Sequence, residues 1–481
     1  MSDIYGPLSP GAANERFSEL KETASFVTAE KHGGVMRVSY RGGLPDAIPD
    51  VVLGHTASWS DVRPRGDFTV ERYNPIRGAA TQRDRELAVT DAVRHIESLG
   101  KMALLYGWYG TPIITELSSR IEIANLVVRD EIVASDIENK ALLLDHLRAA
   151  GCDTARVPTN LVVKGANQLP PFSDIVARLG LPFVAQGRSQ GGDGTIIVDS
   201  EIAFQATHTL RDEIRLAEFV DAPYSSIYCL SLPTADHQTT SVFVDTPSRK
   251  PVGVDELGIS SVTGAGGDWR LGYDMDMVSV TENISRLAQY LYHRYNFFGH
   301  FVVEGFVQKD GDFLFNEINA RPGGGSEVCG SNQLRHGLAP FTALHVLAHQ
   351  GLVAGTPELA ATYNTAVAEA NTTAGQAGAF YLKVQNDTAA ARHPTAAYKG
   401  SGRYQLLGDR LQYIDDHASD PLAADFDNDT ILVANGPLGP VLPDKQLFTL
   451  EGSGRVPIVD SQNQLTERAR QLARAANKLF V

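Results

Sequence analysis

Short apolar runs separated by amphipathic stretches shape the first part of the chain. Runs at 51–54, 102–106 and 126–128 are typical of buried strands. Apolar positions at helical spacing predict a helix over 83–99. Because strands that alternate with helices indicate an α/β fold class with some parallel sheet, we predict an N-terminal α/β domain over residues 1–130.

The middle of the chain continues this alternation and adds a glycine-rich segment. Helical spacing predicts helices over 140–150 and 284–295. Two strand-like runs flank the connection GRSQGGDGT, at 181–186 and 196–200. Further strands are expected at 227–232, 241–244, 301–307 and 313–318. These elements form a second predicted unit over residues 131–350.

The last part of the chain differs in composition. Alanine and threonine dominate residues 354–380. Strand-like runs then follow at 380–384, 404–407, 411–414 and 430–434. One apolar stripe predicts an amphipathic helix at about 466–479. We predict a mixed C-terminal domain over 351–481 that packs against the rest, because no long low-complexity linker precedes it.

Charge narrows the range of partners. The 481 residues include 42 Lys and Arg against 57 Asp and Glu, a formal net charge of −15. Phosphate backbones and anionic lipids repel such a surface, so no nucleic acid and no membrane is expected as a partner. A small anion responds to its local pocket more than to net charge, so phosphate ligands are not excluded.

Hydropathy and cysteine usage point to a cytoplasmic location. No apolar run reaches the ~20 residues that span a bilayer. The nearest run, 338–355, contains His345 and His349 and is better explained as a buried helix. The N-terminus shows no secretory signal, and the three cysteines fit neither a zinc pattern nor a disulfide scaffold. We therefore expect a cytoplasmic protein with reduced cysteines.

The strongest chemical signal is a hairpin with one carboxylate on each strand. Asp310 and Gly311 lie between two apolar runs, and this dipeptide is typical of a type I′ turn with positive φ at both residues. A two-residue loop places Glu304 directly opposite Glu317. A four-residue loop gives the same register, whereas a three-residue loop shifts it.

Opposed carboxylates in an apolar ribbon need a compensating cation. Alternation along the strand adds the amide oxygen of Asn319 beside Glu317, and hard oxygen ligands suit Mg²⁺ or Mn²⁺. The alternative is a solvated hairpin with a polar face. Arg321, two residues further on, suits a carboxylate or a transition-state oxyanion, or else forms a salt bridge to Glu304 or Glu317.

The glycine-rich connection is a second candidate site. Glycine lets backbone N–H groups approach phosphate oxygens, and four glycines occur there: Gly187, Gly191, Gly192 and Gly194. Taken alone, this segment is a weak signal, and a glycine-rich surface hairpin is the default interpretation. Its position before the carboxylate hairpin in the chain makes a phosphate site the better interpretation.

Glu304, Glu317 and Asn319 within NEINARPGG resemble the metal-binding signature of the ATP-grasp ligase superfamily, and the resemblance extends over about 200 residues. It implies an ATP-grasp fold, with α+β architecture in the ATP-binding part and a lid at about 155–225 that carries the glycine loop. It also implies that Lys140 contacts nucleotide phosphate. Glu218 and Val220, in a segment similar to the family's hinge, would contact the base and ribose.

Two positions depart from that pattern. The strand before the glycine loop usually ends in a lysine, and here it ends in Gln186, which cannot offset charge; Arg188 is the candidate substitute. A glutamate that often follows the hinge is missing at Ser225 and Ser226. Both departures affect the assignment of individual contacts to ATP, and neither affects the resemblance to the superfamily.

Within the superfamily, the long C-terminal extension and VVLGHTASWSD most resemble the pheganomycin-type peptide ligases of actinobacterial natural-product pathways. This implies ATP-dependent formation of an amide bond, of peptide or γ-glutamyl type, between small amino-acid or peptide substrates through an acyl phosphate, with Mg²⁺ or Mn²⁺. It also implies Arg321 and Arg188 as catalytic candidates, and a possible homodimer. Two alternatives stay open: a bicarbonate-using carboxylase-like enzyme, and a degenerate nucleotide-binding regulatory protein.

Two further groups are weaker candidates for substrate contacts. Arg270 and the segment 264–267 are candidates for an acceptor pocket. The favoured alternative is that they form an ordinary loop. In the C-terminal domain the candidates are His393, Lys399 and Arg403, for which a solvated loop is the favoured interpretation.

Overall fold

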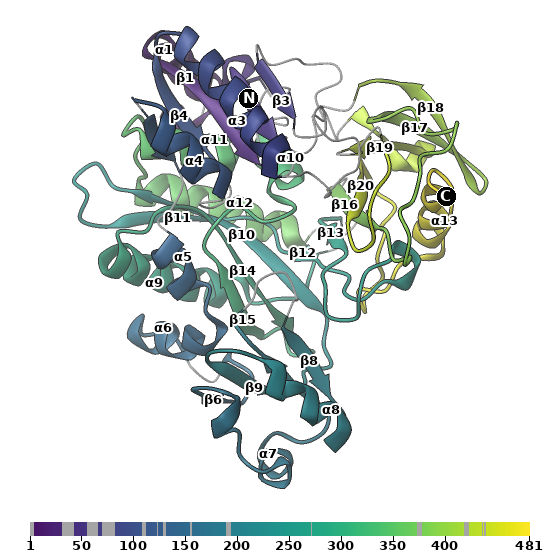
Figure 1. Cartoon of the computed structure of the whole chain (residues 1–481). Coiled ribbons are helices and arrows are strands. Elements are labelled where there is room, and N and C mark those ends of the chain that lie inside the picture. The colour runs from purple at the N-terminus through teal and green to yellow at the C-terminus, as the bar shows by residue number, and fades with distance from the viewer. Residues whose placement is uncertain are drawn as a thin grey trace.

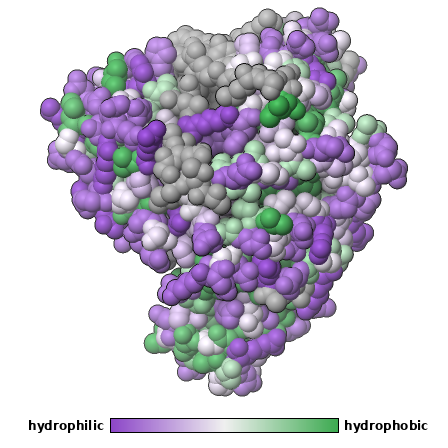
Figure 2. Space-filling model, turned by 180° about the vertical axis from the view of Figure 1, so that it is seen from behind, coloured by the Kyte–Doolittle hydropathy of each residue, from purple (hydrophilic) through white to green (hydrophobic). Residues whose placement is uncertain are grey.

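In the residues that it describes, the computed structural model contains three β-sheets with helices packed against them (Figure 1). These residues are 4–30, 43–54, 66–69, 82–107, 112–122, 124–127, 131–153, 156–188, 194–270, 272–372, 378–417, 423–434, 436 and 439–481. No helix in these ranges is long and apolar enough to cross a membrane. Figure 2 shows that hydrophilic side chains cover most of the described surface on one face, with hydrophobic ones in small groups.

The N-terminal sheet has five parallel strands in the order β3-β2-β1-β4-β5. Their bounds are β1 Ala24–Glu30, β2 Val51–Gly54, β3 Gly66–Thr69, β4 Met102–Tyr106 and β5 Ala124–Val127. Helices α1 (Pro10–Thr23) and α11 (Phe341–His349) pack on one face, and α3 (Gln82–Ser98) and α4 (Pro112–Arg120) pack on the other. The α/β prediction is therefore confirmed, although the central strand β1 was not predicted.

A small antiparallel sheet forms a separate lobe that projects from the rest of the molecule (Figure 1). Its order is β6-β9-β7-β8, with bounds β6 Asn160–Val163, β9 Ile214–Glu218, β7 Phe183–Gln186 and β8 Thr195–Val198. Helices α7 (Phe172–Leu179) and α8 (Glu201–Ala206) bury their apolar faces on it. The two strands predicted around the glycine-rich connection are confirmed as the hairpin β7–β8.

The largest sheet extends from the centre of the molecule into its C-terminal part. Its path is β15-β14-β10-β12-β13-β16-β20-β19-β17-β18, and β11 pairs with β10. The central strands are β10 Tyr224–Pro233, β11 Thr240–Val244, β12 Ser248–Arg249, β13 Gly266–Asp268, β14 Gly299–Val307 and β15 Phe313–Asn319. The C-terminal strands are β16 Gly378–Gln385, β17 Gly402–Leu407, β18 Arg410–Asp415, β19 Thr430–Ala434 and β20 Gln446–Gly454. Because β13 pairs with β16, this sheet crosses the predicted domain boundary near residue 350.

Helices cover this sheet and connect its strands. They are α5 Glu131–Ile137, α6 Leu143–Ala149, α9 Met277–Tyr295, α10 Ser326–Arg335, α12 Pro357–Thr372 and α13 Glu467–Asn477. The apolar stripe of α9, with Ile284, Leu287 and Leu291, packs in one core with Phe301 and Phe313 from the strands of the carboxylate hairpin. That core holds the hairpin rigidly from one side.

Candidate active site around two opposed carboxylates

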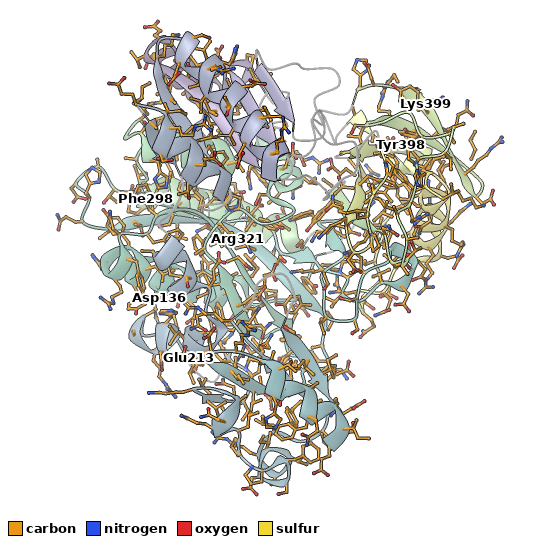
Figure 3. All side chains as sticks on the ribbon, in the orientation of Figure 1. Asp136, Glu213, Phe298, Arg321, Tyr398 and Lys399 are labelled. Carbon is orange, nitrogen blue, oxygen red and sulfur yellow. The ribbon has the colours of Figure 1, made fainter. Side chains whose placement is uncertain are left out.

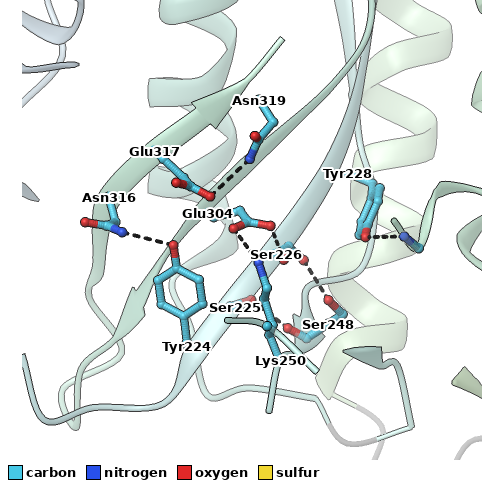
Figure 4. Close-up of polar contacts among 12 residues, drawn as sticks. Tyr224, Ser225, Ser226, Tyr228, Ser248, Lys250, Glu304, Asn316, Glu317 and Asn319 are labelled. Carbon is cyan, nitrogen blue, oxygen red and sulfur yellow. Dashed lines mark hydrogen bonds and ion pairs between the residues drawn. The ribbon is translucent and has the colours of Figure 1, made fainter. Parts of the chain in front are cut away.

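Three neighbouring strands place one polar side chain each in a single row. Ser226 of β10 is paired with Glu304 of β14, and Glu304 is paired with Glu317 of β15. Figure 4 shows the three side chains together at the surface of the sheet. The predicted opposition of Glu304 and Glu317 is confirmed.

The turn that produces this register differs from the prediction. The loop has three residues, 309–311, because Gln308 N donates to Asp312 O at 2.8 Å and Gly311 N donates to Gln308 O at 3.1 Å. Only Gly311 has positive φ, +86°, so the type I′ prediction was wrong. The strands are then one residue out of the expected register as far as Gly305, which pairs with Phe315.

A β-bulge restores the register just before the carboxylates. Between the pairs Gly305–Phe315 and Glu304–Glu317, β15 contains one extra residue, Asn316. Its side-chain Nδ2 donates to the hydroxyl of Tyr224 at 3.0 Å. The bulge therefore decides which residues face each other at the site, and no turn rule predicts it.

Each carboxylate is paired with its own lysine. Lys140 Nζ lies 2.9 Å from Glu317 Oε2, and Lys250 Nζ lies 2.5 Å from Glu304 Oε2. Ser226 Oγ donates to the other oxygen of Glu304 at 2.8 Å. Lys140 begins a 3₁₀ turn, η4 (Lys140–Leu142), that precedes α6, so the single helix predicted over 140–150 is in fact two elements.

The two carboxylates differ in proton affinity. Burial raises the pKa of Glu304, and the nearby Glu317 charge adds to that rise although Lys250 opposes it. Burial would also raise the pKa of Glu317, but Lys140 and the hydrogen bond from Glu304 outweigh it and hold that pKa well below its ordinary value. Of the pair, Glu304 is therefore the one that takes up a proton more readily.

Asn319 and Arg321 continue the row along the edge of the site. Asn319 Nδ2 donates to Glu317 Oε1 at 3.3 Å, and its Oδ1 accepts from Arg321 Nη2 at 3.1 Å. Arg321 Nε lies 3.2 Å from Glu138 Oε1. Arg321 thus lies beside the predicted metal ligands, and its recorded ion pair is to Glu138 rather than to the two carboxylates named in the salt-bridge alternative.

Lys250 was missed by sequence reasoning. It follows β12 in an ordinary loop segment, and no motif distinguishes it. A glycine makes room for it: a Cβ on Gly264 would lie 2.2 Å from Lys250 Cε. The segment 264–267 therefore does more than form a loop, since Gly266–Asp268 is strand β13 and Gly264 admits the lysine to the site.

The glycine hairpin lies in the lobe formed by the small sheet. Gly187 N donates to Gly194 O at 2.9 Å, and Gly194 has φ of +71°, which favours glycine. Gln186 ends β7 and is buried. Gly191 and Gly192 lie outside the described residues.

The remaining nucleotide candidates lie at the rim of this lobe. Arg188 donates to Ser135 Oγ, and its guanidinium lies 3.8 Å from Asp136 of α5, so its recorded contacts do not include the carboxylates. Glu218 ends β9, where its Oε1 accepts from Thr159 N at 2.9 Å. Val220 follows in the connection to β10.

The structure does not bring the weaker candidates for substrate contacts together at one site. Arg270 is buried in a two-bond pair with Asp268, at 2.8 and 3.0 Å, which is a structural role. Arg403 pairs with Asp415 at 3.0 Å within the C-terminal sheet. Figure 3 shows Lys399 in the C-terminal part of the molecule, well away from Arg321 at its centre.

The donor set at the hairpin fits a hard divalent cation. It comprises the carboxylates of Glu304 and Glu317 and the side-chain amide of Asn319, whose nitrogen faces Glu317 here and whose oxygen would join the set after rotation of the amide. The described residues contain no group of three or more His, Cys, Asp or Glu side chains that could hold a metal alone. Mg²⁺ typically uses one or two protein carboxylates and completes its shell with phosphate oxygens and water, so the set suits Mg²⁺ held jointly with a polyphosphate.

Comparison with known proteins bears on the fold. No protein-family model and no curated sequence matches the chain. The biotin carboxylase domain of Hydrogenobacter thermophilus 2-oxoglutarate carboxylase, solved with MgADP, ADP and bicarbonate, is 12% identical with a TM-score of 0.55, and the match covers 90% of this chain and 86% of that one.

Two further solved structures match over nearly their whole length. An L-amino acid ligase from Bacillus licheniformis is 12% identical with a TM-score of 0.50, covering 95% of this chain and 98% of that one. The N5-carboxyaminoimidazole ribonucleotide synthetase of Thermus thermophilus is 14% identical with a TM-score of 0.50, covering 94% and 98%. At such identities the similarity concerns architecture, and the chain has the ATP-grasp fold that its motif implied.

Proposed function

We propose that this protein is an ATP-dependent ligase that joins an amino-acid carboxylate to the amine of an amino acid or peptide. The observation that carries the proposal is the row Ser226–Glu304–Glu317, in which each carboxylate meets a lysine from another part of the chain. The similarity to an L-amino acid ligase supports the substrate class. Membership of the pheganomycin-type subfamily, in specialised metabolism, is part of the proposal.

The reaction proceeds in two balanced steps. A carboxylate oxygen of the first substrate attacks the γ-phosphorus of ATP, which forms an acyl phosphate and releases ADP. The amine of the second substrate attacks the acyl carbon, loses a proton, and expels inorganic phosphate. Both steps move negative charge onto oxygens beside the site, so the protein's task is positioning and charge stabilisation.

The residues divide into three groups by role. Glu304, Glu317 and Asn319 would hold Mg²⁺, which when bound neutralises the β- and γ-phosphates. Lys140, released from Glu317, and the hairpin 186–194 would position the triphosphate. Arg321 would hold the acyl phosphate or the reacting carboxylate, because a guanidinium offers paired donors to such oxygens. Glu218 and Val220 would contact the base and ribose, and Arg188 is a second catalytic candidate.

A second candidate reaction uses bicarbonate. It is supported by similarity to a biotin carboxylase domain whose structure contains bicarbonate. Both reactions start from a carboxylate-type oxygen nucleophile and ATP, so the described site residues do not separate them. A third candidate is a regulatory protein that binds a nucleotide without hydrolysing it. The neutral Gln186, in the place of the usual lysine, favours this candidate.

A phosphate-release screen tests these options together. Purified protein is incubated with ATP, Mg²⁺ and pairs of amino acids, and the products are identified by mass spectrometry. Phosphate release that requires two amino acids, with a new amide product, supports the ligase. Release stimulated by bicarbonate alone supports the carboxylase. Binding of ATP without release across the whole panel would contradict both reactions and favour the regulatory protein.

A further inference from the structure

Arg215 is a buried cation that has no role in the reaction proposed above. It lies on β9 in the small sheet, and 1% of its surface is exposed. On the neighbouring strand it pairs in register with Gln186, the last residue before the glycine hairpin. The guanidinium is thus next to the position where the family pattern has a lysine.

All recorded hydrogen bonds of Arg215 go to neutral oxygens. Its Nη1 donates to Gln186 Oε1 at 3.3 Å, to Asn316 O at 3.0 Å and to Asn316 Oδ1 at 3.1 Å. Its Nη2 is fully buried and has no hydrogen-bond partner in the part of the chain that the structure describes. One terminal nitrogen of the guanidinium is therefore hydrogen-bonded, and the other is enclosed with unused donor capacity.

A buried guanidinium without an anion is costly. Burial lowers the pKa of Arg215 to about 10, so the group is still charged at neutral pH. No carboxylate of the described residues forms an ion pair with it: the Glu317 charge favours its protonated form from a distance, but that carboxylate is paired with Lys140 at 2.9 Å. Buried charges are normally paired, which indicates that an anion from outside the chain completes this site.

The contacts of Arg215 also locate that anion. Gln186 belongs to the glycine hairpin, and Asn316 is the bulge residue directly before Glu317. The single Nη1 atom reaches both, so the guanidinium lies where the hairpin meets the carboxylate row. A polyphosphate that is covered by the hairpin and shares a cation with the carboxylates must pass this junction.

We propose that Arg215 binds a phosphate oxygen of the nucleotide and supplies, from the adjacent strand, the positive charge that Gln186 lacks. This inference rests on the proposed function, because it assigns a partner to the same nucleotide. It makes Gln186 a positioning residue, whose amide oxygen orients the guanidinium. The substitution of glutamine for lysine is then a transfer of charge across a strand pair rather than a loss of function.

Calorimetric titration with MgADP and with adenosine tests the role. The variants are Arg215→Met, Arg215→Gln and the double variant Gln186→Lys/Arg215→Met, with Arg178→Gln on α7 as a control in the same lobe. We expect Arg215→Met and Arg215→Gln to bind MgADP about 10- to 100-fold more weakly than wild type, with adenosine affinity unchanged. The double variant should regain most of the MgADP affinity, and the control should match wild type.

Several outcomes would overturn the assignment. Unchanged MgADP affinity in both single variants would show that Arg215 does not contact phosphate. Equal losses for MgADP and adenosine, or failure of both single variants to fold, would show that the arginine only maintains the lobe. Wild-type protein that binds neither ligand would contradict the proposed function itself, whereas wild-type binding with unaffected variants contradicts this inference alone.

Discussion

Glu304 and Glu317 face each other across β14 and β15, and their charge is balanced by lysines rather than shared with one cation. Lys140 approaches from the chain before the small sheet, and Lys250 from the loop after β12. Two like charges directly opposite each other are destabilising, so the lysines stabilise the hairpin in the absence of metal. In the proposed reaction, Mg²⁺ bound with nucleotide would replace the lysines at the carboxylates and leave them able to contact phosphate oxygens.

Glu317→Gln should separate metal dependence from folding. The variant keeps the shape of the side chain but loses the charge that Mg²⁺ requires. We expect Mg²⁺ to lose its effect on ADP binding in calorimetry, and ATP-dependent phosphate release to fall about 100-fold or more. Glu282→Gln, on the exposed side of α9, should leave both measurements at wild-type values. An unaltered Mg²⁺ dependence in Glu317→Gln would exclude the metal assignment.

Arg321→Ala should affect the rate more than nucleotide affinity. Its guanidinium contacts Asn319 at 3.1 Å and Glu138 at 3.2 Å, beyond Asn319 at the end of β15. We expect turnover at saturating ATP to fall about 100-fold, because a donor to a developing oxyanion is lost. The dissociation constant for MgADP should stay within about threefold of wild type. A collapse of nucleotide binding with a surviving rate would contradict this role.

Glu138→Gln provides the matched test for Arg321. The side chain of Glu138 is 6% exposed and lies beside Arg321 Nε, so the amide should keep the packing while it weakens the orientation of the guanidinium. We expect a smaller reduction in turnover of the same kind, with the affinity for MgADP unchanged. A change in affinity without a change in rate would indicate that the pair organises the nucleotide site instead.

In the carboxylate hairpin, the strands could be predicted from the sequence but the turn could not. Apolar runs around Asp310 and Gly311 correctly predicted both strands and the opposition of Glu304 and Glu317. The assumed turn was wrong, and the register was nevertheless correct, because the extra residue Asn316 offsets the three-residue loop. A bulge depends on tertiary contacts, such as those of Asn316, that local sequence patterns do not encode.

Other parts of the structure gave weaker signals. β1 was not predicted because its segment ASFVTAE mixes polar and apolar residues, although it is the central strand of the N-terminal sheet. Strand β20 was not predicted either, and it ends in GSG, small residues that are typical of loops. Lys250 and Arg215 occur in no motif, and only the three-dimensional fold brings them to the carboxylates and to Gln186.

Gly264→Ala should act on the site through Lys250. The added Cβ would lie 2.2 Å from Lys250 Cε, the far end of a flexible side chain, so the lysine can move at little cost to folding. We expect the midpoint of thermal unfolding to change by only about 1 °C, which for a chain of this length corresponds to about 1 kcal/mol. Phosphate release should fall to the level of Lys250→Met, which removes the same ammonium directly.

Gly11→Ala on α1 is the control for that substitution, because no atom lies within 4 Å of its added Cβ. It should leave phosphate release unchanged and stabilise the protein slightly, since alanine favours helix more than glycine does. If Gly264→Ala retains full activity while Lys250→Met does not, the glycine is not needed to admit the lysine. If both retain full activity, Lys250 has no role in turnover.

Because His300 is buried, we expect the folded protein to lose stability as the pH falls. The ring is fully buried in β14, its Nε2 lies 3.3 Å from Ser326 Oγ, and burial lowers its pKa to about 3. In the unfolded chain a histidine takes up its proton near pH 6.5, so between about pH 6.5 and 3 the unfolded state binds more protons. The stabilisation is therefore complete above about pH 6.5 and is lost as the pH falls, by up to about 1.4 kcal/mol per pH unit.

Denaturant unfolding at a series of pH values measures this contribution as a difference between wild type and His300→Gln. The variant has no group that titrates at this position, so its free energy of unfolding should decline less steeply below about pH 6.5 than that of wild type. His208→Gln, at an exposed position of the 3₁₀ turn η7 (Thr207–Thr209), should follow the wild-type curve. Parallel curves for wild type and His300→Gln would mean that the folded protein accepts the proton at His300 as readily as the unfolded chain does, which would require water or a carboxylate to reach a ring that is now enclosed by Tyr228 and Phe341.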